Sequence, residues 1–163
     1  MAKIRWIRQY DQYSCGGVAL VNVLKWLSYP ATYSLLPALR KLCKCSQPKG
    51  TGQRYLEAAL RKLGIQFKRK TQPTIREIDR HLDSGGIVLV HYYIVIGHYS
   101  LCVGRNKDIY TMVNDIDDVT VSELHRNDLK YRLEWSFDGL KRWTWFVFPG
   151  VVDEAKVKRV LND

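Results

Sequence analysis

The hydrophobic pattern of this chain changes once, at Gly85 and Gly86, and this change limits the possible folds. Before the two glycines, apolar residues recur three and four positions apart, and after them they form short β-branched and aromatic runs. The first pattern is typical of helices with one buried face, and the second is typical of strands. Helices followed by strands favour an α+β fold with a mostly antiparallel sheet. We therefore predict N-terminal helices that pack on such a sheet, in a single domain over residues 1–163.

The helix signals are specific at two places. After Cys15, apolar residues recur at helical spacing until Pro30 stops the pattern. Thr74 and Glu77 have the spacing of a capping box, in which the two residues bond each other's backbone N–H groups. The expected helices cover residues 15–27, 34–43, 55–63, 74–86 and 152–161.

The strand signals come mainly from the second half of the chain. Runs rich in valine, isoleucine and aromatic residues are separated by short polar segments, as in an antiparallel sheet. The residues at 106–107 have the character of a hairpin tip. The expected strands cover residues 65–69, 87–96, 98–105, 108–115 and 142–148.

Composition limits the compartment and the cofactors. The chain has 163 residues, of which 46% are hydrophobic and 26% charged, as in ordinary soluble domains. Its longest apolar run, residues 86–97, is too short to span a membrane, and the N-terminus lacks a signal-peptide pattern. We expect a cytoplasmic protein without a membrane span. A disulfide framework is not expected in the cytoplasm. Cys43 and Cys45 lack a second pair of cysteine or histidine ligands at zinc spacing, so we predict neither a metal nor a cofactor.

The net charge of +10 bears on possible partners. Lysine and arginine exceed aspartate and glutamate by 26 to 16, and such an excess raises affinity for acidic or polyanionic partners. No nucleic-acid-binding motif accompanies it, so a solvated basic face is the simpler interpretation. The sequence leaves the oligomeric state open.

A cysteine at the start of a helix is the first candidate for chemistry. The N-terminus of a helix presents unpaired N–H groups and favours negative charge, which promotes the thiolate form of Cys15. A nucleophilic thiol also needs an imidazole and a group that orients the imidazole. His98 begins a predicted strand and Asp115 ends the next one. If the two strands form a hairpin, both residues emerge at the same end of it.

An oxyanion donor is the remaining requirement, and glutamines precede the cysteine. Gln9 lies six residues before Cys15, with enough chain to turn back over the thiol, whereas Gln12 lies only three residues before it. Each assignment has a competitor, and a cysteine taken alone is more often core packing. The competitors are His91 as the base, Gln12 as the oxyanion donor, and Asn114, Asp117 or Asp118 as the orienting group.

Three motifs in this order resemble the papain-like C39 peptidases. The motifs are Q-x5-C-G-G-x-A-L, G-H-Y-S-L-C-V-G and Y-x-x-V-N-D, and the resemblance extends over residues 5–120 in element order. The family includes the leader-peptide-cleaving domains of bacteriocin exporters and free-standing C39-like relatives. The resemblance implies a papain-like fold with Cys15 as nucleophile, His98 as general base, Asp115 as orienting carboxylate and Gln9 in the oxyanion hole.

Two departures from the family pattern leave the substrate open. Ser14 stands where exporter domains usually carry an acidic residue, and Ile116 stands where a proline is common. The chain contains no transporter region, so a role in peptide export by this chain alone is not expected. We predict a cysteine peptidase that hydrolyses a peptide or amide bond in a peptide or protein. The alternatives are a deamidase or acyltransferase with the same triad, or a non-catalytic basic module that binds peptide or nucleic acid.

Overall fold

The structure is a computed structural model that describes residues 4–93, 97–116, 119–135 and 141–163. The chain forms two compact units, Met1–Gln66 with Gly150–Asp163, and Phe67–Pro149. The first unit is helical and the second contains a six-stranded antiparallel sheet, so the α+β class is confirmed. The single domain stays a prediction.

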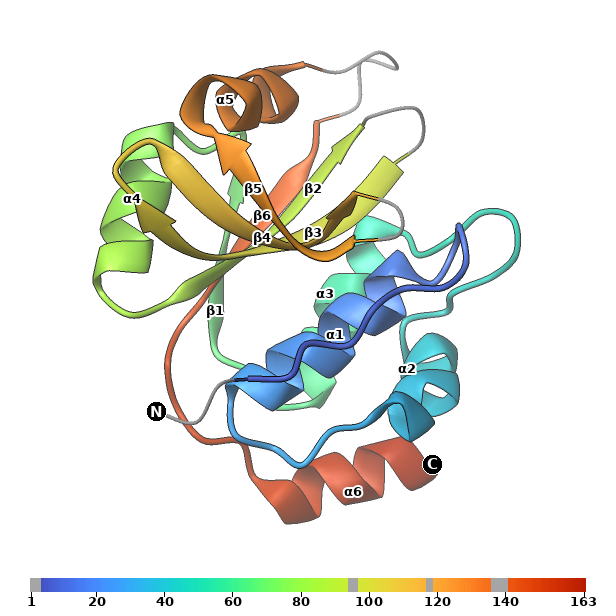
Figure 1. Ribbon diagram of the computed structural model, residues 1–163. Helices are drawn as coiled ribbons and strands as arrows, with labels where there is room; N and C mark the ends of the chain where they lie inside the picture. The colour runs from blue at the N-terminus through green and yellow to red at the C-terminus, as the bar shows by residue number, and fades with distance from the viewer. Residues whose placement is uncertain (1–3, 94–96, 117–118, 136–140) are drawn as a thin grey trace. The chain divides into compact units, whose positions relative to one another are not determined.

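The first unit is built around a helix that is buried along most of its length. Every residue of α1 (Cys15–Trp26) from its first position to Leu24 is buried, as expected for a helix that is apolar on all sides. Figure 1 shows the extended N-terminal segment running alongside α1, and α6 lying beside α2. The other helices of this unit are η1 (Tyr33–Leu35), α2 (Leu36–Leu42), α3 (Gln53–Lys62) and α6 (Glu154–Asn162).

A buried amide fastens the N-terminal segment to α1. The Ile7 backbone N–H donates to Asn22 Oδ1 at 2.7 Å, and Asn22 Nδ2 donates to the Ile7 carbonyl at 2.9 Å. A buried polar side chain is stable only when its hydrogen bonds are satisfied, and this pair uses both ends of the amide. The segment that leads to Cys15 is therefore fixed in register along the helix.

The second unit is a sheet in the order β1-β6-β2-β3-β4-β5, and every neighbouring pair is antiparallel. Two helices, α4 (Ile75–Asp83) and α5 (Arg126–Glu134), cover one face of the sheet (Figure 1). Their apolar side chains form one buried cluster with those of the strands. The strands are β1 (Phe67–Thr71), β2 (Ile87–Tyr93), β3 (Gly97–Asn106), β4 (Ile109–Ile116), β5 (Val119–His125) and β6 (Trp143–Val147).

Several local predictions are confirmed. The first helix begins at Cys15, and the capping box forms, with Thr74 N donating to Glu77 Oε2 at 2.8 Å and Glu77 N to Thr74 Oγ1 at 3.3 Å. The hairpin of β3 and β4 is present, but its turn lies one residue later than expected, where Lys107 has a φ of +53°. The first strand likewise begins later, at Phe67.

The sequence-based prediction missed two elements, β5 and α5. Residues 94–96 of the strand expected over 87–96, and the competitors Asp117 and Asp118, lie outside the described residues. Within the described ranges, no helix is long and apolar enough to cross a membrane, and no three potential metal ligands gather. The four cysteines are all described, and all are free thiols.

Candidate active site

The four predicted site residues divide between the two units. Cys15, the first residue of α1, and Gln9, in the segment before it, belong to the helical unit. His98 and Asp115 belong to the sheet unit. In the sheet unit, the antiparallel pairing of β3 and β4 brings His98 and Asp115 to the same end of the hairpin, as predicted.

A carboxylate builds the turn that leads into α1. Asp11 Oδ1 accepts from the backbone N–H groups of Tyr13 and Ser14, at 3.0 and 2.6 Å, and Oδ2 accepts from Ser14 Oγ at 2.7 Å. Partial burial raises the pKa of Asp11, but the bonds from Ser14 and Tyr13 outweigh it, and the pKa lies below its ordinary value. Ser14 is the residue before Cys15, and the carboxylate of Asp11 bonds both its backbone and its hydroxyl group. An acidic group thus lies next to the residue before Cys15, although that residue is a serine. The sequence analysis missed this role.

The two glycines after Cys15 are required by close packing. A Cβ at Gly16 would lie 2.8 Å from Cβ of Thr51, and one at Gly17 would lie 2.9 Å from Leu36 Cδ1. Real Cβ atoms do not approach neighbours this closely, so larger residues would displace the start of α1. The Cys-Gly-Gly motif therefore sets the position of Cys15, which is 5% exposed.

The two candidate glutamines differ in environment. Gln9 is half-buried, and its Nε2 donates to the backbone carbonyl of Asp11, so the turn that precedes α1 also orients this amide. Gln12 is exposed. This difference favours Gln9 as the residue with a fixed side chain.

The other thiols differ from one another in burial. Burial raises the pKa of Cys43 to about 11 and that of Cys102 to about 12, so both stay protonated at neutral pH. Cys45 is half-exposed, and its Sγ donates to the Tyr13 carbonyl at 3.1 Å. Cys45 is therefore the thiol against which the reactivity of Cys15 has to be measured.

The imidazole of His98 bonds to a main-chain carbonyl. Ladder pairing between β3 and β4 reaches Leu101 and Val113. Beyond this pair, Ser100 Oγ donates to the Val113 carbonyl at 3.0 Å, and His98 Nε2 lies 2.5 Å from the Asn114 carbonyl oxygen. A carbonyl oxygen only accepts, so Nε2 carries the proton in this contact.

The carboxylate of Asp115 pairs with a guanidinium. Arg132 Nη1 lies 2.8 and 2.9 Å from its two oxygens, and the side chain of Asp115 is fully buried. Burial raises the pKa of Asp115 above its ordinary value, and the charge of Arg132 offsets this only in part. Arg132 was not predicted, because a single arginine on a polar helix carries no sequence signal.

The competing base, His91, points away from His98. In the pairing of β2 with β3, His91 lies opposite Tyr99, and Tyr92 lies opposite His98. Paired residues share a face of the sheet and successive residues alternate, so the two histidines lie on opposite faces. The ring of His91 stacks on that of Tyr99 at 4.3 Å between centroids.

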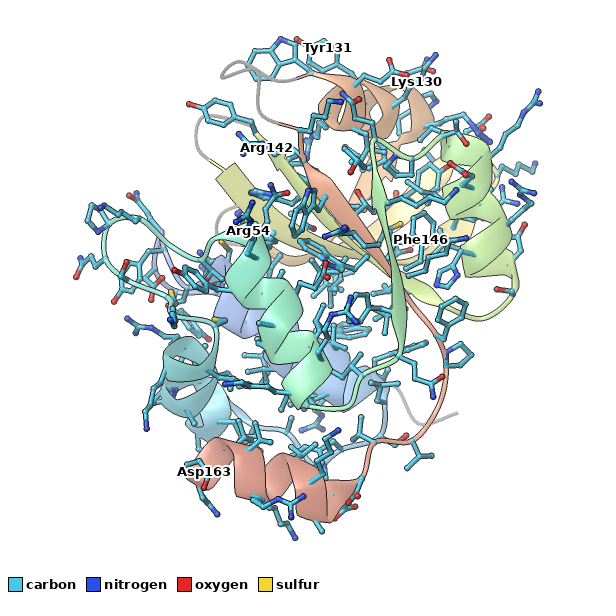
Figure 2. All side chains as sticks on the ribbon, turned by 180° about the vertical axis from the view of Figure 1, so that it is seen from behind. Arg54, Lys130, Tyr131, Arg142, Phe146 and Asp163 are labelled. Atoms are coloured by element: carbon cyan, nitrogen blue, oxygen red, sulfur yellow. The ribbon has the colours of Figure 1, made fainter. Side chains whose placement is uncertain are left out.

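A hollow of about 240 Å³ opens next to the ion pair on the sheet unit. Tyr131, which projects from α5 (Figure 2), is largely exposed, and its ring stacks on that of Trp135 at 6.1 Å between centroids. Arg132 therefore faces Asp115 on one side and an open aromatic hollow on the other. The hollow is lined by Tyr93, Asp128, Tyr131, Arg132 and Trp135.

The basic cluster at residues 68–70 lies on β1, at the edge of the sheet. The guanidinium of Arg69 lies 4.1 Å from the ring centroid of Trp143, and Lys70 pairs with Glu77. Two of its three cations thus make contacts within the sheet unit, which supports the interpretation as an ordinary surface.

No family profile and no curated protein matches the sequence of this chain. Solved structures match its fold. The peptidase domain of Streptococcus ComA, a bifunctional ABC transporter involved in quorum sensing, matches with a TM-score of 0.67 and 22% identity, over 90% of this chain and 99% of that one.

Two further solved structures match the fold of this chain. A double-glycine-motif protease from an AMS/PCAT transporter, in complex with the leader peptide, matches with a TM-score of 0.65 and 14% identity, over 90% of this chain and 94% of that one. A Bacillus anthracis protein described as a C39-like peptidase matches with a TM-score of 0.66 and 10% identity, over 90% and 96%. This chain therefore has the fold of the C39 peptidase domains, as the resemblance of its motifs predicted.

Proposed function

We propose that this protein is a cysteine peptidase that hydrolyses a peptide or amide bond, with Cys15 as nucleophile and His98 as general base. The likeness of its fold to C39 peptidase domains, over 90% of the chain, carries the proposal. Two local features support it. Cys15 stands at the N-terminus of a buried helix, and His98 has one ring nitrogen bonded to a carbonyl that can only accept.

The proposed reaction has two stages. The Cys15 thiolate attacks the substrate carbonyl carbon, and the backbone N–H of Cys15 and the amide of Gln9 stabilise the oxyanion. The C–N bond then breaks as the His98 imidazolium gives its proton to the leaving amine, which leaves a thioester on Cys15. Water, deprotonated by His98, hydrolyses the thioester and returns the thiol. Asp115 is proposed to support the histidine.

A peptide is the proposed substrate. One structural neighbour is a protease solved with a leader peptide, and the same fold supports a peptide ligand here. In this chain Ser14 precedes the proposed nucleophile, and its hydroxyl donates to Asp11 Oδ2.

A peptide-library assay combined with thiol labelling tests the proposal. We expect wild-type protein to cleave a subset of peptides and Cys15→Ala to abolish cleavage, since the nucleophile is removed. His98→Ala should be nearly as damaging, because residues that act as a unit are not additive. Cys45→Ala is the matched control, because it removes a half-exposed thiol of the same helical unit and should leave cleavage intact.

The products separate the proposed reaction from its alternatives. New peptide termini indicate hydrolysis of a peptide bond, ammonia without new termini indicates deamidation, and transfer to an added amine indicates acyl transfer. Substantial cleavage by Cys15→Ala would show that the nucleophile is wrong. Absence of cleavage, together with equally slow labelling of Cys15 and Cys45, would favour a non-catalytic binding module. Binding of a polyanion through the basic surface stays a prediction, and its affinity should fall steeply with salt.

A further inference from the structure

The end of β4 has an unusual backbone conformation at the residue that bonds His98. Asn114 has a φ of +53°, in the left-handed region, and the pairing of β4 with β5 is irregular between Val113 and Ile116. Asparagine adopts this conformation more readily than most residues. The irregularity takes the Asn114 carbonyl out of the regular strand, and this carbonyl accepts from His98 Nε2.

The next residue is fastened to another element. Both carboxylate oxygens of Asp115 accept from one nitrogen, Nη1 of Arg132 on α5. The same nitrogen donates to the Tyr92 hydroxyl at 3.3 Å, and the guanidinium carbon lies 5.3 Å from the centroid of the Tyr92 ring. Tyr92 in turn lies opposite His98 in the sheet. The ion pair therefore links α5 to both strands that flank the imidazole's position.

We propose that the main-chain carbonyl of Asn114 orients His98, and that Asp115 is a positioning residue that acts through its ion pair with Arg132. This inference rests on the proposed function, and it replaces the direct carboxylate–imidazole bond that the family resemblance implies. The ion pair fixes the peptide that follows Asn114, so the carbonyl stays directed at Nε2.

Charge balance supports this assignment. Asp115 and Arg132 together are neutral, so the pair adds little net charge beside the imidazolium that forms during the reaction. Substitution of one member of a buried ion pair strongly lowers the free energy of unfolding, because the other charge stays buried without its partner. Substitution of both members changes the stability much less. A positioning role of Asp115 therefore predicts that a variant with both residues replaced recovers activity, whereas a direct catalytic role predicts that it does not.

The test is a double-mutant cycle with Asp115→Asn, Arg132→Gln and the combined variant. Each single substitution should lower kcat by about 10²-fold, since a displacement of about 1 Å at a catalytic group has effects of this size. The combined variant should recover to within about tenfold of wild type, because contacting residues couple and the neutral pair can form hydrogen bonds.

The pH dependence of Cys15 alkylation is the second readout, with all variants made in a Cys45→Ala background. The combined variant should keep the wild-type profile, because the Asn114 carbonyl is retained. If Asp115 stabilised the imidazolium directly, its loss would move the alkaline limb to lower pH in the single and the combined variant alike.

Arg126→Gln is the matched structural control. Arg126 lies on the same helix and its Nη1 and Nη2 donate to Asp79 Oδ2, at 3.1 and 2.5 Å, so its loss weakens the attachment of α5 elsewhere. It should lower the free energy of unfolding and leave the alkylation profile unchanged.

The outcomes separate this inference from the function on which it rests. If the wild type is active but the combined variant is as inactive as Asp115→Asn, the inference is wrong and the proposed function stands. A wild type that neither cleaves peptides nor alkylates selectively at Cys15 would overturn both. Recovery of activity and of the wild-type pH profile in the combined variant would support both.

Discussion

His98 Nε2 lies 2.5 Å from the main-chain oxygen of Asn114, and the left-handed conformation of Asn114 makes this carbonyl available. This partner of His98 is thus a main-chain group, whose position depends on a backbone conformation and not on a side-chain type. Substitutions at Asn114 that preserve or oppose this conformation should separate the contribution of the backbone from that of the side chain.

Asn114→Gly and Asn114→Ala form a matched pair. Both remove the amide side chain, but only alanine resists a positive φ, at a cost of about 1 kcal/mol. We expect Asn114→Ala to have the lower free energy of unfolding and the lower kcat, and Asn114→Gly to stay closer to wild type. Denaturant unfolding and peptide cleavage measure the two quantities. Equal kcat in the two variants would argue against control by this backbone conformation.

Among the three thiols other than Cys15, reactivity should follow burial. Burial raises the pKa of Cys43 to about 11 and that of Cys102 to about 12. Only the thiolate reacts, so at neutral pH both thiols should be protected from iodoacetamide, and their labelling should increase as the pH rises toward those values. Mass spectrometry of the native protein should find modification first at Cys45, which is half-exposed, and at Cys15, which is buried but is the proposed nucleophile.

Cys45→Ala controls for the accessible second thiol. In this variant a single fast-labelling cysteine should remain. Fast labelling of Cys102 at neutral pH would show that the sheet unit opens, because this thiol is fully buried in its core cluster.

The sequence predicted those elements whose signals are local. The start of α1 at Cys15 and the capping box of Thr74 and Glu77 depend on residues a few positions apart. β5 and α5 were missed because each buries few side chains: β5, an edge strand, buries Leu124, and α5 buries Leu129 and Leu133. The few side chains that β5 and α5 bury do not form a clear hydrophobic pattern in the sequence.

The candidate site shows the same limit. The sequence placed His98 and Asp115 at one end of a hairpin, which the strand pairing confirms. It could not show that Asp115 pairs with Arg132, because this contact requires α5 to cross back over the sheet. The bond from His98 to Asn114 depends on a main-chain carbonyl, which every residue has, so no residue type marks it.

Gly16 should be sensitive to the smallest substitution. A Cβ there would lie 2.8 Å from Cβ and Oγ1 of Thr51. Overpacking costs about 1–3 kcal/mol, which exceeds the gain of about 0.5–1 kcal/mol that alanine brings to a helix. We expect Gly16→Ala to lower the free energy of unfolding and to slow alkylation of Cys15.

Two variants check this cause. Gly104→Ala introduces a Cβ with nothing within 4 Å and should change stability little. Thr51→Gly in the Gly16→Ala background should restore part of the lost stability, because it removes the atoms in conflict. A Gly16→Ala variant as stable as wild type would show that α1 can shift without cost.

Gln9 and Gln12 should differ sharply in their effect on turnover. Gln9 is half-buried and its amide is oriented by the Asp11 carbonyl, whereas Gln12 is exposed. Loss of one oxyanion donor typically lowers kcat by about 10²–10³-fold. We expect Gln9→Ala to lower kcat by this amount and Gln12→Ala to have a much smaller effect, measured as steady-state peptide cleavage.

Alkylation distinguishes a lost oxyanion donor from a damaged nucleophile. Reaction of the thiolate with iodoacetamide develops no oxyanion, so Gln9→Ala should alkylate at Cys15 near the wild-type rate although its turnover is low. A Gln9→Ala variant impaired equally in both assays would indicate that Gln9 supports the turn before α1 and not the transition state. A Gln12→Ala variant with low turnover, beside an active Gln9→Ala variant, would transfer the oxyanion role to Gln12.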